Sequence, residues 1–158
     1  MGLRRYRVAT IDHVGADVIA VEEVQGSGAL NSEFKRYCIS VKGRNLPKGE
    51  SKSFHFNKNN VRKLEEISTV LGMEATIAFV FVDNQEGIKK ARLIISELET
   101  FRKSSDDEQV KFINWHKDKE GFHIKFTQSR YQKHLDAIKA REDVIYIEFT
   151  LDEKLTEY

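Results

Sequence analysis

The most constraining feature of the sequence is a stretch that changes from helical spacing to strand-like spacing within a few residues. Asn57 or Asn60 can cap the start of a helix over residues 57–72, and Gly72 suits its end. Residues 74–82, the most apolar run of the chain, follow directly. A buried strand that comes after a helix is typical of a strand parallel to its neighbour, so this stretch predicts a sheet with a parallel pair. Apolar residues share one face of the expected helix: Val61, Leu64, Ile67 and Leu71.

Three strands are expected before this helix, over residues 6–11, 17–24 and 37–41. Both later segments are rich in β-branched residues, and a connection with Gly26 and Gly28 separates them, which is typical of antiparallel neighbours. The apolar run in 17–24 predicts burial on both faces and a central position. Residues 45–53, which hold the only proline, are expected to form a polar loop.

After the parallel strand, the pattern predicts a turn, a strand, a short helix begun by Ser96 and Glu99 as a capping box, a hairpin, an amphipathic helix and a final strand. The expected ranges are 83–87, 91–95, 96–102, 110–115 with 121–127, 129–141 and 144–151. This order predicts an α+β, or mixed α/β, fold with a central sheet flanked by helices.

Length and composition indicate one domain of the ordinary soluble kind. The chain has 158 residues, 40% of them hydrophobic and 32% charged, which suits a single sizeable core and a charged surface. No apolar run is long enough for a membrane helix, and the first residues lack a signal-peptide core. The single cysteine, Cys38, is expected to be a buried structural thiol. We therefore expect no membrane partner and a cytoplasmic location.

A lysine and an aspartate stand out at the ends of the second and third strands. Side chains alternate along a strand, so Ser40 and Lys42 share a face of the third strand, and Asp17 begins the second. Two interpretations stay open from these residues alone. Lys42 and Asp17 can form a site together, or Lys42 can reach solvent while Asp17 belongs to the preceding turn.

The net charge is only +1, but basic residues gather between positions 35 and 63, with nine Lys or Arg against one acid, Glu50. Such a concentration can attract a polyanion although the whole chain is near neutral. Alternatively, the residues can spread over a loop and both sides of a helix without forming a patch. The candidates for nucleic-acid contact are Lys35, Arg36, Arg44, Lys48, Lys52, Lys58 and Arg62.

Motifs of other site classes are missing from the sequence. There is no Walker motif, no Gly-x-Gly-x-x-Gly run and no Gly-x-Ser-x-Gly run. The five histidines have no zinc spacing.

The order of three strands, a helix and a buried strand resembles the core of the PD-(D/E)XK nuclease superfamily, which includes restriction endonucleases and archaeal Holliday-junction resolvases. Residues 15–20, Gly-Ala-Asp-Val-Ile-Ala, resemble the family's Gly-x-Asp strand, and residues 39–43, Ile-Ser-Val-Lys-Gly, resemble its third strand. The resemblance covers about residues 5–100 and implies a restriction-endonuclease-like mixed sheet. It implies one nuclease-like domain over 1–158, in which about 103–158 form a C-terminal hairpin, helix and strand.

The resemblance implies an activity as well: hydrolysis of DNA phosphodiester bonds with Mg²⁺ or Mn²⁺ as cofactor. Asp17 would be the metal ligand and Lys42 the catalytic cation. Ser40 departs from the family, because it stands where a second metal carboxylate is expected. Asp12 is the best local candidate for that carboxylate. The family usually has a helix before the first strand; only residues 1–5 precede that strand here, so this helix is missing, relocated or supplied by a partner.

Three functions follow as hypotheses. The first is a metal-dependent DNA endonuclease with Asp17, Ser40 and Lys42 at the catalytic position. The second is a catalytically inactive nuclease-fold module that binds nucleic acid through the basic segment. The third is a protein-interaction module that docks on a partner subunit through a sheet edge. The family implies DNA as partner, and a homodimer if both strands are cut.

Overall fold

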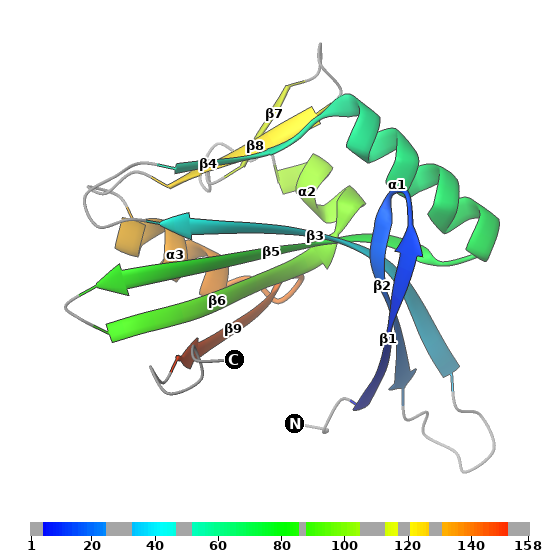
Figure 1. The fold of residues 1–158 in the computed structure, drawn as a ribbon, viewed down its shortest axis with the longest axis horizontal. Coiled ribbons are helices and arrows are strands. Elements are labelled where there is room, and N and C mark those ends of the chain that lie inside the picture. Colours follow the sequence, from blue (N-terminus) through cyan, green and yellow to red (C-terminus); the bar gives the residue numbers. More distant parts are fainter. Residues whose placement is uncertain are drawn as a thin grey trace.

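A computed structural model describes residues 5–24, 33–46, 52–85, 88–104, 113–116, 121–126 and 131–151 of the chain. Its centre is a six-stranded sheet in which one pair of neighbours is parallel (Figure 1). The other pairs of this sheet are antiparallel. The strands, in spatial order, are β1 (Arg5–His13), β2 (Ala16–Val24), β3 (Glu33–Leu46), β5 (Glu74–Gln85), β6 (Ile88–Glu97) and β9 (Ile145–Thr150).

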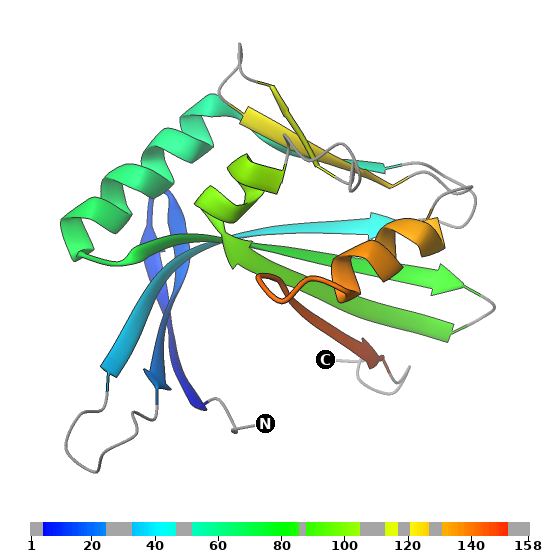
Figure 2. The same ribbon diagram turned by 180° about the vertical axis from the view of Figure 1, so that it is seen from behind.

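A second, three-stranded antiparallel sheet lies above the first, together with three helices (Figures 1 and 2). Its order is β4 (Lys52–Phe56), β8 (Gly121–Phe126) and β7 (Ile113–His116). The helices are α1 (Lys58–Leu71), α2 (Leu98–Ser104) and α3 (Tyr131–Lys139). The expected α+β class with a mixed central sheet flanked by helices is confirmed. No described helix is long and apolar enough to cross a membrane.

The helix expected over 57–72 and the parallel strand expected after it are both present. Asn57 caps α1, since its side chain accepts a hydrogen bond from the backbone N–H of Asn60 at 3.0 Å. Gly72 ends the helix at φ 62°, a left-handed conformation that favours glycine. After it, β5 pairs in parallel with β3, as expected.

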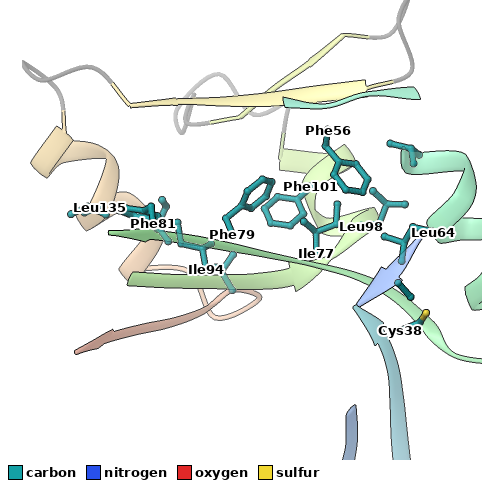
Figure 3. Close-up of a cluster of buried hydrophobic side chains, with 14 residues drawn as sticks. Cys38, Phe56, Leu64, Ile77, Phe79, Phe81, Ile94, Leu98, Phe101 and Leu135 are labelled. Atoms are coloured by element: carbon teal, nitrogen blue, oxygen red, sulfur yellow. The ribbon is translucent and has the colours of Figure 1, made fainter. Parts of the chain in front are cut away.

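The hydrophobic core lies between the helices and the six-stranded sheet (Figure 3). Phe79 of β5 and Phe101 of α2 meet edge to face at its centre, with ring centroids 5.7 Å apart. Cys38 is fully buried here, and burial raises the pKa of its thiol. The expectation that Cys38 is buried is therefore confirmed. The largest fully buried side chains are Phe56, Phe79, Phe81, Phe101, Leu64, Ile77, Ile94 and Leu98.

Several sequence-based expectations were wrong in detail. The polar loop expected over 45–53 ends in a strand, β4, whose partner β8 lies some 70 residues later. Of the turn expected at 83–87, residues 83–85 belong to β5, and residues 86–87 lie outside the described part of the chain. Ser96 does not start α2: it lies in β6, and its hydroxyl donates to the backbone carbonyl of Asp143 at 2.7 Å.

The first and second strands also differ from the prediction. The first strand continues past its expected end at residue 11, since Asp12 and His13 belong to β1. Strand β2 lies one position in from the sheet edge, and Val18, Ile19 and Val21 are only partly buried rather than covered on both faces. Residues beyond 103 supply strands to both sheets, since β9 completes the central one and β8 pairs with β4.

Candidate functional site

The candidate site lies where β2 separates from β3. The last paired residues are Val18 and Ile39, which places Asp17 opposite Ser40. Asp17 Oδ2 accepts a hydrogen bond from the backbone N–H of Val41 at 2.7 Å and a long one from the Ser40 hydroxyl at 3.4 Å. The carboxylate thus replaces the backbone acceptor that β2 no longer supplies. Asp17 itself is exposed, whereas Ser40 is buried.

Gly15 brings helix α1 against the start of β2. It has φ 108°, and a Cβ added to it would lie 2.7 Å from the backbone carbonyl oxygen of Lys63 in α1. Only glycine allows both this conformation and this approach. As a result, the middle of α1 contacts the chain at Gly15, two residues before Asp17.

Lys42 lies on the same side of β3 as Ser40, facing the helices. Its Nζ is 5.5 Å from the centroid of the Phe56 ring, and Phe56 is fully buried. A cation over an aromatic face is attracted by the ring quadrupole, which holds the ammonium in place. Because Phe56 directly precedes the α1 cap Asn57, Lys42 lies close to the beginning of α1.

A β-bulge in β1 brings Asp12 to the same point of the sheet. Thr10 pairs with Val18 and His13 with Ala16, so Ile11 and Asp12 together stand opposite Asp17. Such bulges change where a side chain points and are frequent beside active sites. The side chain of Asp12 lies outside the described part of the structure. Its backbone position is adjacent to Asp17 across the β1–β2 hairpin.

The carboxylate oxygens at this site suit a divalent cation such as Mg²⁺, but they are the smallest number of protein ligands that such a cation usually has. Asp17 offers Oδ1, which accepts no hydrogen bond from the described residues, and Asp12 is its neighbour in register. Among the residues whose side chains are described, no group of three His, Cys, Asp or Glu could hold a metal ion. Magnesium is often bound by one or two carboxylates together with waters and substrate phosphates. The site fits a cation of that kind and does not form a complete protein cage.

The other acids of β2 point away from this site or lie too far along the strand. Glu22 accepts a hydrogen bond from the Tyr37 hydroxyl at 2.7 Å on the opposite face of the sheet. Glu23 is exposed near the far end of β2, six residues from Asp17, a separation of about 20 Å along a strand.

The basic candidates divide among several places. Lys35 lies on the face of β3 away from the helices, while Arg36 shares the face of Lys42 but lies six residues, about 20 Å, along the strand. Arg44 follows Lys42 on the same face, is exposed, and donates to the Gly43 carbonyl at 2.8 Å. Lys48 and the side chain of Lys52 fall outside the described residues. The structure therefore brings together only part of the expected set.

The two candidates on α1 lie one turn apart on its first half. Lys58 is exposed in the first turn, beside the Phe56–Lys42 contact. Arg62 is exposed too, but its guanidinium forms an ion pair with Glu66 at 2.7 Å. Lys58 and Arg44 are thus the exposed cations that flank Lys42 most directly.

Sequence reasoning missed two features of the site. Phe56 supports the Lys42 ammonium, and the Val41 N–H fixes the Asp17 carboxylate. The first has a weak sequence signal, because Phe56 stands next to the helix cap. The second has none, since a backbone group becomes available only where the neighbouring strand departs.

Comparison with known proteins gives little beyond a loose structural likeness. No protein-family description matches the sequence, and no curated protein matches it. Among solved structures, the chain is similar to Hjc, a Holliday junction resolvase from Archaeoglobus fulgidus, with a TM-score of 0.40 and 15% identity. The match covers 81% of this chain and 75% of the resolvase.

Proposed function

We propose that this chain is a metal-dependent DNA endonuclease of the PD-(D/E)XK type. The observation that supports the proposal is the arrangement at the point where β2 leaves β3. There a carboxylate fixed by a backbone N–H lies opposite Ser40, and Lys42 follows two residues later on the same face of β3. The order of three antiparallel strands, a helix and a parallel strand adds to it, although β4 is inserted before the helix.

In this proposal Asp17 holds and orients the cation. The Val41 N–H fixes its Oδ2, so Oδ1 already points in one direction before a cation binds. Binding then costs little further side-chain entropy. Asp12 would be the second oxygen ligand. A divalent cation such as Mg²⁺ or Mn²⁺ supplies, when bound, Lewis-acid polarisation of the phosphodiester and acidification of water.

Lys42 would stabilise the negative charge that develops on the phosphate oxygens during hydrolysis. Its ammonium is held over Phe56, on the edge of a buried core, so little reorganisation is needed as charge builds up. Ser40 would support Asp17 through its hydroxyl and carries no charge of its own. DNA would then cross the end of β3 and the beginning of α1, where Arg44 and Lys58 are exposed to its phosphates.

The proposal is tested by cleavage of supercoiled, linear, branched and single-stranded DNA in Mg²⁺ or Mn²⁺. The wild type is compared with Asp17→Asn and Lys42→Met, which keep the size of each side chain. Cutting by the wild type that both substitutions abolish would support the proposal, and cutting that is equal in all three proteins would refute it.

The serine at position 40 favours a second candidate function, a nuclease-like module that binds nucleic acid without cutting it. With serine at position 40, β3 adds no carboxylate beside Asp17, so the site has less negative charge to hold magnesium than the family pattern implies. This alternative predicts binding that weakens between about 50 and 200 mM salt and does not change when chelator replaces metal. It also predicts weaker binding by Arg44→Ala and Lys58→Ala, with no loss by Asp17→Asn.

A further inference from the structure

At the start of β3 the central sheet narrows to three strands, because β5 pairs with β3 only from Tyr37 onward. There β1, β2 and the first residues of β3 continue as a ribbon that extends away from the other strands (Figures 1 and 2). One face of the ribbon continues the face of β2 and β3 that holds Asp17 and Lys42, since side chains alternate along each strand. We call it the ribbon face. Its described side chains are those of Arg7, Val21, Glu23, Phe34 and Arg36.

An aromatic ring is open to solvent on the ribbon face. Phe34 is 57% exposed although it lies within a paired part of β3. A single exposed apolar residue is common on protein surfaces and indicates nothing by itself. What distinguishes Phe34 is the set of charges around it.

Two arginines share the ribbon face with Phe34. Arg7 and Arg36 both stand opposite Val21, one on each side of it, so their Cα atoms are about 10 Å apart. Both are exposed, and within the described part of the chain neither takes part in an ion pair. Their guanidinium groups are therefore available to an anionic ligand.

One acid lies on the same face. Glu23 is exposed and stands opposite Phe34, one pair of residues beyond the arginines. Two arginines against one glutamate leave a net charge of +1, so the ribbon face attracts anions on balance. The position of Glu23 also gives a testable sign, because its charge opposes an anionic ligand.

We propose that the ribbon face binds a single-stranded segment of DNA, with an unpaired base stacked on Phe34 and neighbouring phosphates bound by Arg7 and Arg36. Aromatic side chains on an exposed sheet stack unpaired bases, and basic side chains beside them bind the nucleic-acid backbone. A duplex offers no such base to Phe34, since its bases are stacked on one another. The unpaired arginines favour this polyanion over a neutral protein surface.

The inference deepens the proposed function and rests on it for the choice of DNA. Asp17 and Val21 lie on the same face of β2 and four residues apart, about 13 Å. Ala9 stands between them along β1 and is exposed, so this part of the face is open. One strand of DNA covers about 13 Å with about four nucleotides at roughly 3.4 Å each. A DNA with an unpaired segment about four nucleotides from the cut would thus occupy both places.

The first test measures binding by fluorescence anisotropy in chelator, which prevents metal-dependent cleavage, with single-stranded DNA and with a duplex of the same sequence. Phe34→Ala should weaken binding of the single strand by about tenfold, the contribution of one stacked base, and change duplex binding much less. Phe149→Ala is the matched control, since Phe149 is 47% exposed on β9, on the other face of the sheet. A wild type that does not bind the single strand at about 100 µM, or equal losses for both variants, would overturn the proposal.

The second test uses salt to count phosphate contacts. Arg36→Gln should weaken single-strand binding and lower the slope of log affinity against log salt by about 0.7, the value for one phosphate contact, and Arg7→Gln should do the same. Glu23→Gln should strengthen binding. Lys35→Gln is the matched control, because Lys35 is exposed and loses the same charge on the other face of β3. Equal effects of Arg36→Gln and Lys35→Gln would contradict the proposal, since net charge alone would then explain binding.

The third test reports stacking directly with the fluorescent base 2-aminopurine, whose emission falls when another ring stacks on it. In single-stranded DNA its emission should fall when the wild type binds, and fall less with Phe34→Leu, which keeps an apolar side chain. Asp17→Asn should behave as the wild type, because the measurement needs neither metal nor cleavage. A chain that cuts DNA without stacking a base would refute only this inference. A chain that stacks bases without cutting would refute only the proposed function.

Discussion

The carboxylate of Asp17 accepts a hydrogen bond from the backbone N–H of Val41 at 2.7 Å, where β2 leaves β3. This contact has a structural role and a potential chemical one. It satisfies a backbone donor that has lost its strand partner, and it fixes the direction of the remaining carboxylate oxygen. Asp17 lies in β2 and not in the preceding turn, and its structural role is compatible with a chemical one.

Substitutions at Asp17 should separate these two roles. Asp17→Asn keeps an acceptor for the Val41 N–H, so its free energy of unfolding should stay within about 0.5 kcal/mol of the wild type. Asp17→Ala removes the acceptor and should cost about 1 kcal/mol. Urea denaturation measures both values, while metal-dependent cleavage should be lost in both variants. A larger stability loss for Asn than for Ala would contradict this assignment of the hydrogen bond.

Gly15 should be the least replaceable glycine among those whose surroundings are described. Gly15→Ala places a Cβ 2.7 Å from the Lys63 carbonyl oxygen at φ 108°, so it should lower the free energy of unfolding by about 3 kcal/mol. Gly72→Ala is the matched control: it also has positive φ, 62°, but nothing lies within 4 Å of the added carbon. Its cost should be about 1 kcal/mol. If denaturant titrations gave the same loss of unfolding free energy for both variants, close contact between α1 and Gly15 would be contradicted.

Position 40 should decide how tightly a metal is held. Ser40→Glu adds a second carboxylate beside Asp17, so the Mg²⁺ concentration for half-maximal cleavage should fall by about tenfold or more. Because Ser40 is buried, the variant should be less stable than the wild type without metal and gain melting temperature when Mg²⁺ is added. Ser40→Gln is the neutral control of similar size and should show no such gain. A melting temperature of Ser40→Glu that is insensitive to Mg²⁺ would place the cation elsewhere.

Acid stability should depend on Glu148 of β9. Tyr146 donates to its carboxylate at 2.7 Å, Lys90 at 3.1 Å and Arg92 at 3.0 Å. These hydrogen bonds and the Arg92 charge lower the pKa of Glu148 to about 2. A carboxyl with a lower pKa in the folded state stabilises the fold above its unfolded pKa, near 4.5, and loses that contribution as the pH falls toward 2.

The corresponding measurement is the free energy of unfolding between pH 6 and pH 2. Glu148→Gln should lower the free energy of unfolding by at most about 1 kcal/mol at pH 6, because the Glu148 carboxylate is partly solvated. The difference from wild type should shrink toward pH 2. Glu23→Gln is the control for the loss of one exposed carboxylate elsewhere in the sheet. A difference between Glu148→Gln and wild type that grows toward low pH would contradict a lowered pKa of Glu148 in the folded state.

The parts of the fold that depend on local pattern could be predicted from the sequence. The cap at Asn57, the stop at Gly72 and the apolar run after it specify α1 and β5 without long-range information. Strand β4 was missed because its hydrogen bonds go to β8, far along the chain, and the alternation of Phe54 and Phe56 is too short to identify a strand by itself.

The sequence could name the residues of the candidate site but not their geometry. The two-residue alternation placed Ser40 and Lys42 on one face, and it could also have shown that Lys35 lies on the other. The bulge that brings Asp12 opposite Asp17 depends on register, which no single strand determines. The ribbon face was not foreseen, because it depends on the pairing of three strands.

The most direct test of the central claim is the single-turnover rate of phosphodiester cleavage by the purified chain in Mg²⁺, on the DNA form that the wild type cuts best. Asp17→Asn should lower this rate by at least about 10³-fold and Lys42→Met by at least about 10²-fold, because each removes charge at the reacting phosphate. Asp136→Asn, an exposed acid of α3, should leave it unchanged. A wild type that cuts no DNA in Mg²⁺ or Mn²⁺, or a rate that survives both site substitutions, would contradict the nuclease assignment.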